Sequence, residues 1–259
     1  MRTEHRWPLF RICFAALATR GSCWLLLAGM PLFGWLAPLL TPWEENPQIL
    51  QPARAQAAWT YAWLALLTWL PFQATALGHR LHREGMLEHF RAGGKGPFNL
   101  WAQMSAAILV WMLALMLAAM VVCVTICLPK QPAEAQLWVN LVMQYGALYT
   151  LAGIPLVMLA VALGTRTAEV IAFLAPVALL IVGLFGAAWL TPLLGPAGTA
   201  GLRTFWLALP HYHLADLTSR LVFKMGPLTS SDFIGSATCL ALQGAALCLF
   251  SRCLFRTRS

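Results

Sequence analysis

Charge is scarce in this chain. Only 10% of the 259 residues are Asp, Glu, Lys or Arg, whereas 60% are hydrophobic and the mean hydropathy is +0.71. Soluble domains carry about a quarter of their residues as charges. Because so few charges cannot cover a folded surface in water, the composition excludes an ordinary soluble globular protein and predicts a protein of the lipid bilayer.

Two alternative architectures lack their sequence patterns. The long apolar runs show no polar face, which a helix packed on a water-soluble core would have. Alternating segments of about ten residues, which would indicate a transmembrane barrel, are also missing. We therefore expect an all-α integral membrane protein, with residues 1–259 forming one transmembrane domain.

Six runs are free of acidic and basic side chains, and each can hold the roughly 20 apolar residues of a membrane-spanning helix. The predicted spans lie near 21–43, 57–78, 101–128, 137–163, 170–191 and 233–251. Of the 17 lysines and arginines, twelve fall in segments that would share the side of the N-terminus, and five fall opposite. The positive-inside bias then places both termini in the cytoplasm, in the plasma (inner) membrane. The net charge of +8 is thus a topology signal, and no nucleic-acid partner is expected.

Motifs for catalysis and nucleotide binding are absent. The nearest approach to the phosphate-binding pattern G-x-x-x-x-G-K-[ST] is Gly93-Gly94-Lys95-Gly96, which lacks the spacing and the hydroxyl. No G-x-S-x-G or H-E-x-x-H occurs either, so we expect no catalytic residue, metal or bound cofactor in this chain. A membrane-embedded enzyme and a secondary transporter stay open as weaker alternatives. Pro155 and Pro176 would be the helix breaks of the latter, although no charge lies mid-span.

Residues 1–20 predict a helix lying in the membrane interface. Trp7, Phe10, Phe14 and Leu17 recur at spacings of three and four, with arginines at other positions. An untethered tail is the alternative.

The cytoplasmic connection, residues 79–96, contains "HREGMLEHFRAGG", a helical pattern that ends at Gly93-Gly94 with Pro97 just beyond. His79, His82 and His89 lie near acidic residues, but their spacing fits no common metal site. A short helix with both charge signs and several apolar residues is better explained as a docking surface.

Two polar features remain on the outer side. Gln136, Asn140 and Gln144 recur every four residues and share a face of the fourth span, where they serve either helix–helix bonding or contact with a substrate. In the outer loop, 192–232, Pro210 precedes a mixed run that predicts either a re-entrant helix or a surface helix.

His211, His213 and Asp216 are the candidate gate in that run. The two histidines are two positions apart, so on a helix they would point to different sides, which argues against chelation. Gly183 and Gly186, on the fifth span, predict close helix packing.

The segment "REGMLEHFRAGGKG" resembles the cytoplasmic connection of type 2 ABC exporter permeases, also called ABC-2 permeases, and "LPHYHLADLTSRLVFKMGPL" resembles their C-terminal third. The resemblance implies a coupling helix that docks on a separate ATPase subunit, which would hold ATP and magnesium. It also implies a second permease subunit, identical or not, a surround of membrane lipids, and alternating-access export of an unidentified cargo. The residues to which it assigns coupling are Arg83, Glu84, Leu87, Glu88, Phe90 and Arg91.

Overall fold

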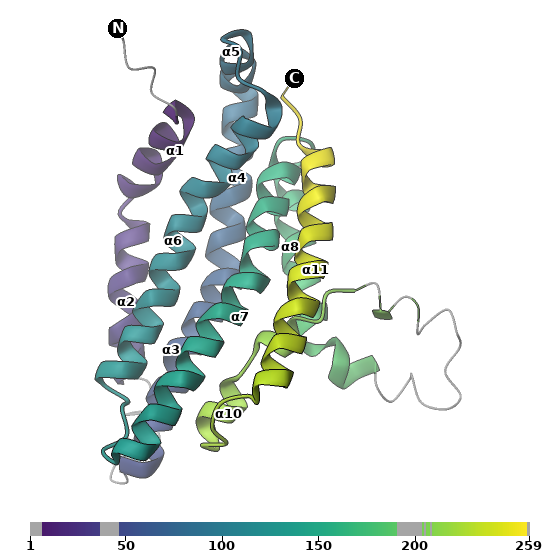
Figure 1. Cartoon of the computed structure of the whole chain (residues 1–259). Coiled ribbons are helices and arrows are strands. Elements are labelled where there is room, and N and C mark those ends of the chain that lie inside the picture. The colour runs from purple at the N-terminus through teal and green to yellow at the C-terminus, as the bar shows by residue number, and fades with distance from the viewer. Residues whose placement is uncertain (1–6, 37–46, 191–203, 205, 208, 258–259) are drawn as a thin grey trace, which may run out of the picture.

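The computed structural model describes residues 7–36, 47–190, 204, 206–207 and 209–257. Within these ranges every regular element is a helix, which confirms the predicted all-α class. Figure 1 shows the long helices standing side by side in one bundle. The elements are α1 (Pro8–Ala18), α2 (Ser22–Leu36), α3 (Pro47–Leu64), the π turn η2 (Ala65–Trp69), α4 (Leu70–Arg83), α5 (Met86–Ala92), α6 (Pro97–Thr125), α7 (Pro132–Gly164), α8 (Glu169–Leu190), the 3-10 helix η3 (Tyr212–Ala215), α10 (Thr218–Val222) and α11 (Ser230–Leu254).

Four of these helices, α6, α7, α8 and α11, are long and apolar enough to cross a membrane. A fifth crossing is obtained if α1 and α2, which meet at 60°, count as one bent span. The four helices overlap the last four predicted spans, and α2 overlaps the first; residues 37–43 and 191 of those spans lie outside the described residues. The chain therefore has helices suited to a multi-pass membrane protein, with four or five candidate spans among the described residues, and the six predicted spans stay a prediction.

The predicted span near 57–78 lies in a helical rod that runs without a gap through α3, η2 and α4. Pro71 lies two residues after the π turn and has no N–H to donate back into it, which accounts for the local widening of the helix. Polar residues, among them Gln51 and Arg54, occupy the start of α3. The apolar stretch is thus divided among three elements, and none of them alone has the length and hydropathy of the four spans above.

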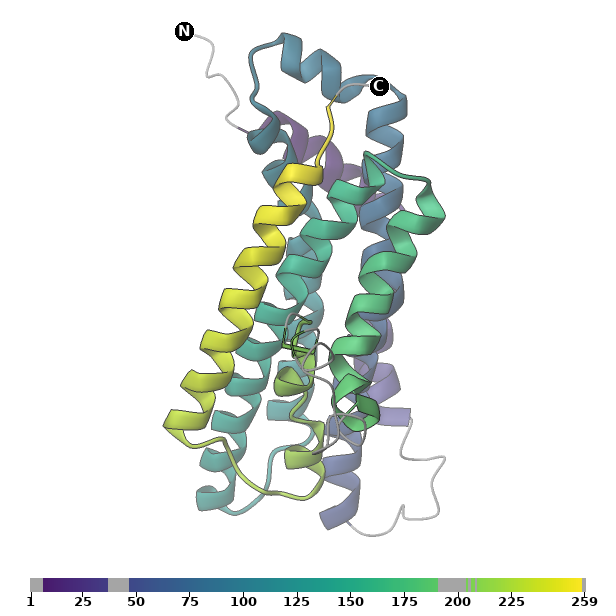
Figure 2. The same ribbon diagram turned by 90° about the vertical axis from the view of Figure 1, so that its right-hand side faces the viewer.

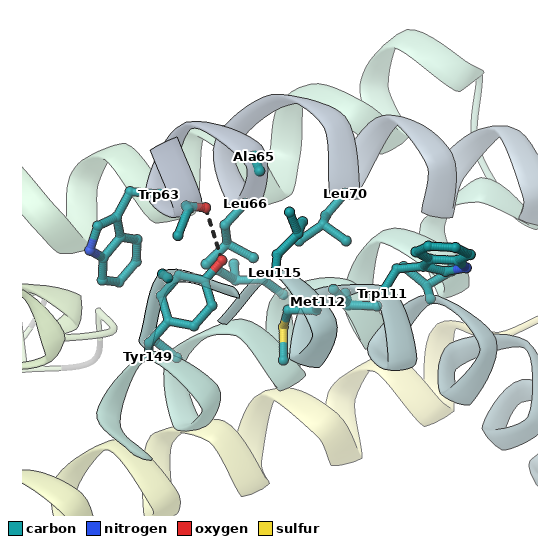
Figure 3. Packing of buried hydrophobic residues seen from close by; sticks show 14 of the residues in the cluster. Trp63, Ala65, Leu66, Leu70, Trp111, Met112, Leu115 and Tyr149 are labelled. Carbon is teal, nitrogen blue, oxygen red and sulfur yellow. Dashed lines mark hydrogen bonds between the residues drawn. The ribbon is translucent and has the colours of Figure 1, made fainter. Parts of the chain in front are cut away.

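The core lies where this rod meets α6 and α7. Leu66 and Leu70 from the rod face Met112 and Leu115 from α6, as Figure 3 shows, and all four are buried. Tyr149 of α7 reaches the rod and donates a hydrogen bond of 2.9 Å to the Ala62 carbonyl. α7 is the central helix, because it also packs against α4, α8 and α11.

The bundle has two distinct ends, which both views show (Figures 1 and 2). At the first, here called the α5 end, α5 lies beside the last turn of α11 and the turn from α7 to α8. At the other, the α10 end, α10 lies beside the turn from α6 to α7 and the start of α11. Thr229 caps α11 there, because its hydroxyl accepts a 3.2 Å hydrogen bond from the Asp232 N–H.

Candidate functional site

The connection at the α5 end is built around two glycines. Gly85 (φ 67°) and Gly94 (φ 83°) adopt the left-handed backbone conformation that residues with a Cβ disfavour. α4 therefore continues to Arg83, and a separate helix of seven residues, α5, begins after Gly85. The predicted helix that ends at Gly93-Gly94 is confirmed, and Gly85 separates it from α4.

α5 has an apolar side and a charged side. Leu87 is completely buried, and Met86 and Phe90 pack partly against the same core. Glu88 and Arg91 are exposed on the other side. Leu87 was expected to fill a cleft of a partner, but it lies inside its own chain, because the turn at Gly85 brings the apolar side of α5 onto α4 and α6. Its role in this structure is to fix α5 on the bundle.

Two arginines near α5 contact polar or acidic side chains. Arg80 Nε lies 4.0 Å from Glu84 Oε1, and both side chains are about half exposed, so this pair contributes little stability. Arg91 Nη1 donates a 2.8 Å hydrogen bond to Thr257 Oγ1. The Arg256 N–H donates to Thr165 Oγ1 at 3.1 Å. The segment after α11 is therefore held against α5 and the end of α7.

His82, at the end of α4, is a titratable group with a shifted pKa. Burial and the positive charge of Arg256 lower its pKa, and Glu88 opposes them more weakly. Its Nδ1 atom is buried without a hydrogen-bond partner. The neutral imidazole is thus the favoured form. In the described part of the chain no three side chains of His, Cys, Asp or Glu lie together as a metal site would require.

The predicted polar residues of α7, which are Gln136, Asn140 and Gln144, make two kinds of contact. Gln136 and Asn140 are exposed, and their amides approach within 3.4 Å of each other. Gln144, by contrast, binds the backbone of Leu228 twice: Gln144 Oε1 accepts from the N–H at 2.7 Å, and Nε2 donates to the carbonyl at 3.1 Å. Gln144 therefore anchors the segment that leads into α11. Asn140 lines an open groove beside this anchor, together with Phe233.

The two outer histidines gather around one indole. The Trp206 ring lies 4.8 Å from the His211 ring and 6.2 Å from that of His213, between centroids, and the two imidazoles are 5.7 Å apart. The expectation that they point to different sides was wrong, because His211 precedes η3 with a non-helical backbone. His211 Nδ1 lies 2.7 Å from Gln243 Nε2 of α11, which ties this cluster to the last helix.

The segment with these histidines packs closely on α8. A Cβ atom at Gly183 would lie 2.8 Å from the Pro210 carbonyl oxygen, and one at Gly186 would lie 2.7 Å from the Trp206 ring. Both distances are too short for a real side chain, which confirms the predicted close packing at these glycines. Gly183 is about 10 Å from the end of α8 at 1.5 Å per residue, so the segment reaches back along the bundle. Residues 192–203 of the predicted outer loop lie outside the described residues.

Asp216 belongs to a hydrogen-bonded cluster that was not predicted. Its Oδ1 accepts from the Tyr145 hydroxyl at 2.7 Å and from the Thr218 N–H at 3.0 Å. Trp63 Nε1 donates to the same tyrosine oxygen at 2.8 Å, and Trp59 stacks on the Tyr145 ring with centroids 3.9 Å apart. The cluster joins α3, α7 and the segment before α10. No spacing in the sequence signals it, because Tyr145 is 82 positions from Trp63 and 71 positions from Asp216.

Comparison with known families, curated proteins and solved structures gives no match. The function is therefore inferred from the geometry. This geometry offers a charged short helix, fixed on the bundle at one end, and a hydrogen-bonded segment, from His211 to Thr218, that packs on α7, α8 and α11.

Proposed function

We propose that this chain is the transmembrane subunit of an ATP-driven exporter of the type 2 ABC class, and that a separate ATPase subunit binds and hydrolyses ATP with magnesium. The observation that supports this most directly is the construction of α5. Leu87 ties the helix to the bundle while Glu88 and Arg91 face outward. A movement imposed on such a helix is transmitted to α4 and α6, against which it packs.

The proposal includes six crossings. The α3–η2–α4 rod supplies one, the bent pair α1 and α2 another, and α6, α7, α8 and α11 supply the rest. The α5 end would then face the cytoplasm of the plasma (inner) membrane. α1 is bent by 60° from α2, as suits a helix lying in the interface. Glu84, Arg83 and Phe90 complete the docking surface around α5.

The cargo path in this proposal lies between this chain and a second permease subunit. Gln136 and Asn140 are exposed on the single chain, and amides are costly to leave facing lipid. A partner subunit or a wet path covering α7 removes this cost. The segment from His211 to Asp216 is the outer gate, held closed by the bonds of Gln243 and Tyr145. The alternating access expected of such proteins is a rigid-body movement between two packings.

The test is copurification from the native membrane in mild detergent. A tagged chain should bring down a protein that hydrolyses ATP, and Glu88→Arg, which reverses a charge on the outward side of α5, should reduce its recovery at least about fivefold if that charge is part of a docking hot spot. Glu134→Arg is the matched control. It makes the same reversal on an exposed residue at the α10 end, and it should leave recovery unchanged.

Recovery of no ATPase with the wild-type chain contradicts the proposal. Equal losses with Glu88→Arg and Glu134→Arg contradict the assignment of α5 as the docking element, because the effect would then follow total charge and not position.

A further inference from the structure

A groove at the α5 end is lined by arginines from two separate segments. Arg20, at the bend between α1 and α2, faces Arg80 and Arg83 of α4 across it. Arg20 is held in place, because its Nη1 donates a 3.0 Å hydrogen bond to Gln73 Oε1. Gln73 itself is only 5% exposed, so a buried polar side chain fixes one wall of the groove.

The charges in this groove are incompletely balanced. Glu84 and Glu169 also line it, which leaves one positive charge in excess when His79 is neutral. The ion pair of Arg80 with Glu84 is at the 4.0 Å limit. A single negative charge, such as that of a phosphodiester, would complete the balance and accept hydrogen bonds from guanidinium groups.

Next to the groove, α4 exposes a large apolar side chain along the bundle. From residue 70 to 78, α4 is buried except at Phe72, which is 50% exposed, and at the half-buried Ala76. Phe72, Ala76 and Arg80 are spaced by four residues and so lie on one face of the helix. The face of α4 that borders the groove is therefore basic at the bundle end and apolar toward the middle, which is the order of headgroup and acyl chain in a lipid leaflet.

We propose that this groove binds an anionic phospholipid, with the phosphate between Arg20, Arg80 and Arg83 and an acyl chain along Phe72. Basic pockets between membrane helices bind such headgroups, and each nearby arginine strengthens the attraction. The inference does not depend on the proposed exporter function, since it requires only that the bundle lie in a membrane.

The experiment measures lipid binding to the purified full-length chain in detergent by native mass spectrometry, with phosphatidylglycerol and phosphatidylcholine as probes. The wild type should retain phosphatidylglycerol preferentially. The double variant Arg80→Gln, Arg83→Gln should weaken that binding about tenfold or more. The matched control, Arg11→Gln with Arg252→Gln, removes two charges from exposed positions at the same end but outside the groove, and it should change binding less than about twofold.

Two further arms keep the test decisive if the double variant folds poorly. Glu84→Gln removes a negative charge from the groove and should tighten phosphatidylglycerol binding. Glycerol phosphate added at the same concentration as the lipid should not displace it, because it lacks the acyl chain that contacts Phe72. Equal loss in the two double variants, no tightening with Glu84→Gln, or displacement by glycerol phosphate would each overturn the lipid site.

Discussion

At the scale of single residues, the segment around Asp216 is held by one tyrosine. Tyr145 is completely buried, and its hydroxyl bonds Trp63, Asp216 and Thr218. Tyr149, one turn further along α7, is equally buried but bonds only the Ala62 carbonyl. Replacing each tyrosine with phenylalanine therefore removes a different number of hydrogen bonds from the same helix.

Tyr145→Phe should lower the free energy of unfolding by about 1–3 kcal/mol, because it leaves the buried Trp63 N–H without its acceptor and removes the hydroxyl's bonds with Asp216 and Thr218. Tyr149→Phe should have a smaller effect, since a single carbonyl loses its donor. Unfolding in mixed micelles of dodecyl maltoside and sodium dodecyl sulfate, followed by tryptophan fluorescence, measures both. An effect of Tyr149→Phe as large as that of Tyr145→Phe would show that the cluster around Asp216 does not hold this segment.

Residue roles were predictable where they depend on local backbone or on composition. Gly94 was placed at the end of α5 from the sequence, and Gly183 was predicted to lie in a close contact. Leu87 was assigned to the surface that contacts a partner. A helix of seven residues is too short for the spacing of its apolar residues to show which side is buried. Tyr145 and Trp63 were not found, since aromatic residues in a membrane span resemble ordinary packing until the fold brings them to Asp216.

At the scale of elements, the position of η3 is set by the glycines of α8. Gly183→Ala should destabilise the protein by about 1–3 kcal/mol, because the new methyl group would overlap the Pro210 carbonyl and the Tyr212 ring. Gly235→Ala in α11 is the control, because a Cβ there meets nothing within 4 Å. Alanine is the better helix former, so the control should be neutral or stabilising by up to about 1 kcal/mol.

The same micelle titration compares these two glycine variants. If Gly183→Ala unfolds like the wild type, the segment before α10 does not pack on α8 as closely as described here.

Helix boundaries agree with the prediction from the sequence where apolar runs are long, and they differ from it where a single residue breaks the helix. α6 and α7 coincide closely with predicted spans, because an uninterrupted apolar run in a bilayer has no alternative to a helix. The π turn η2 and the break at Gly85 depend on one proline and one glycine, whose effect is decided by the neighbouring helices. A hydropathy value averaged over many residues does not detect the effect of a single proline or glycine.

At the scale of the whole molecule, the order of turns fixes which segments share a side of the membrane. The turn at Lys130 lies at the α10 end, whereas Gly94 and the turn at Arg166 lie at the α5 end, as Figure 1 shows. This alternation requires α6 and α7 each to cross once. The positive-inside bias predicts that the α5 end faces the cytoplasm, because more of the lysines and arginines lie in segments expected on that side.

Short epitope tags inserted singly after Gly94, Lys130, Arg166 and Gly226 of the full chain should therefore alternate in their accessibility to protease in sealed inside-out vesicles. Tags after Gly94 and Arg166 should be cleaved, and those after Lys130 and Gly226 should be protected. Tags at the N-terminus and after Leu36 discriminate between the span counts. If both the α1–α2 pair and the α3–η2–α4 rod cross, the N-terminal tag is cleaved like the tag after Gly94 and the tag after Leu36 is protected. Both tags are cleaved if neither crosses, and the N-terminal tag is protected if only one crosses; either result contradicts the six-span arrangement.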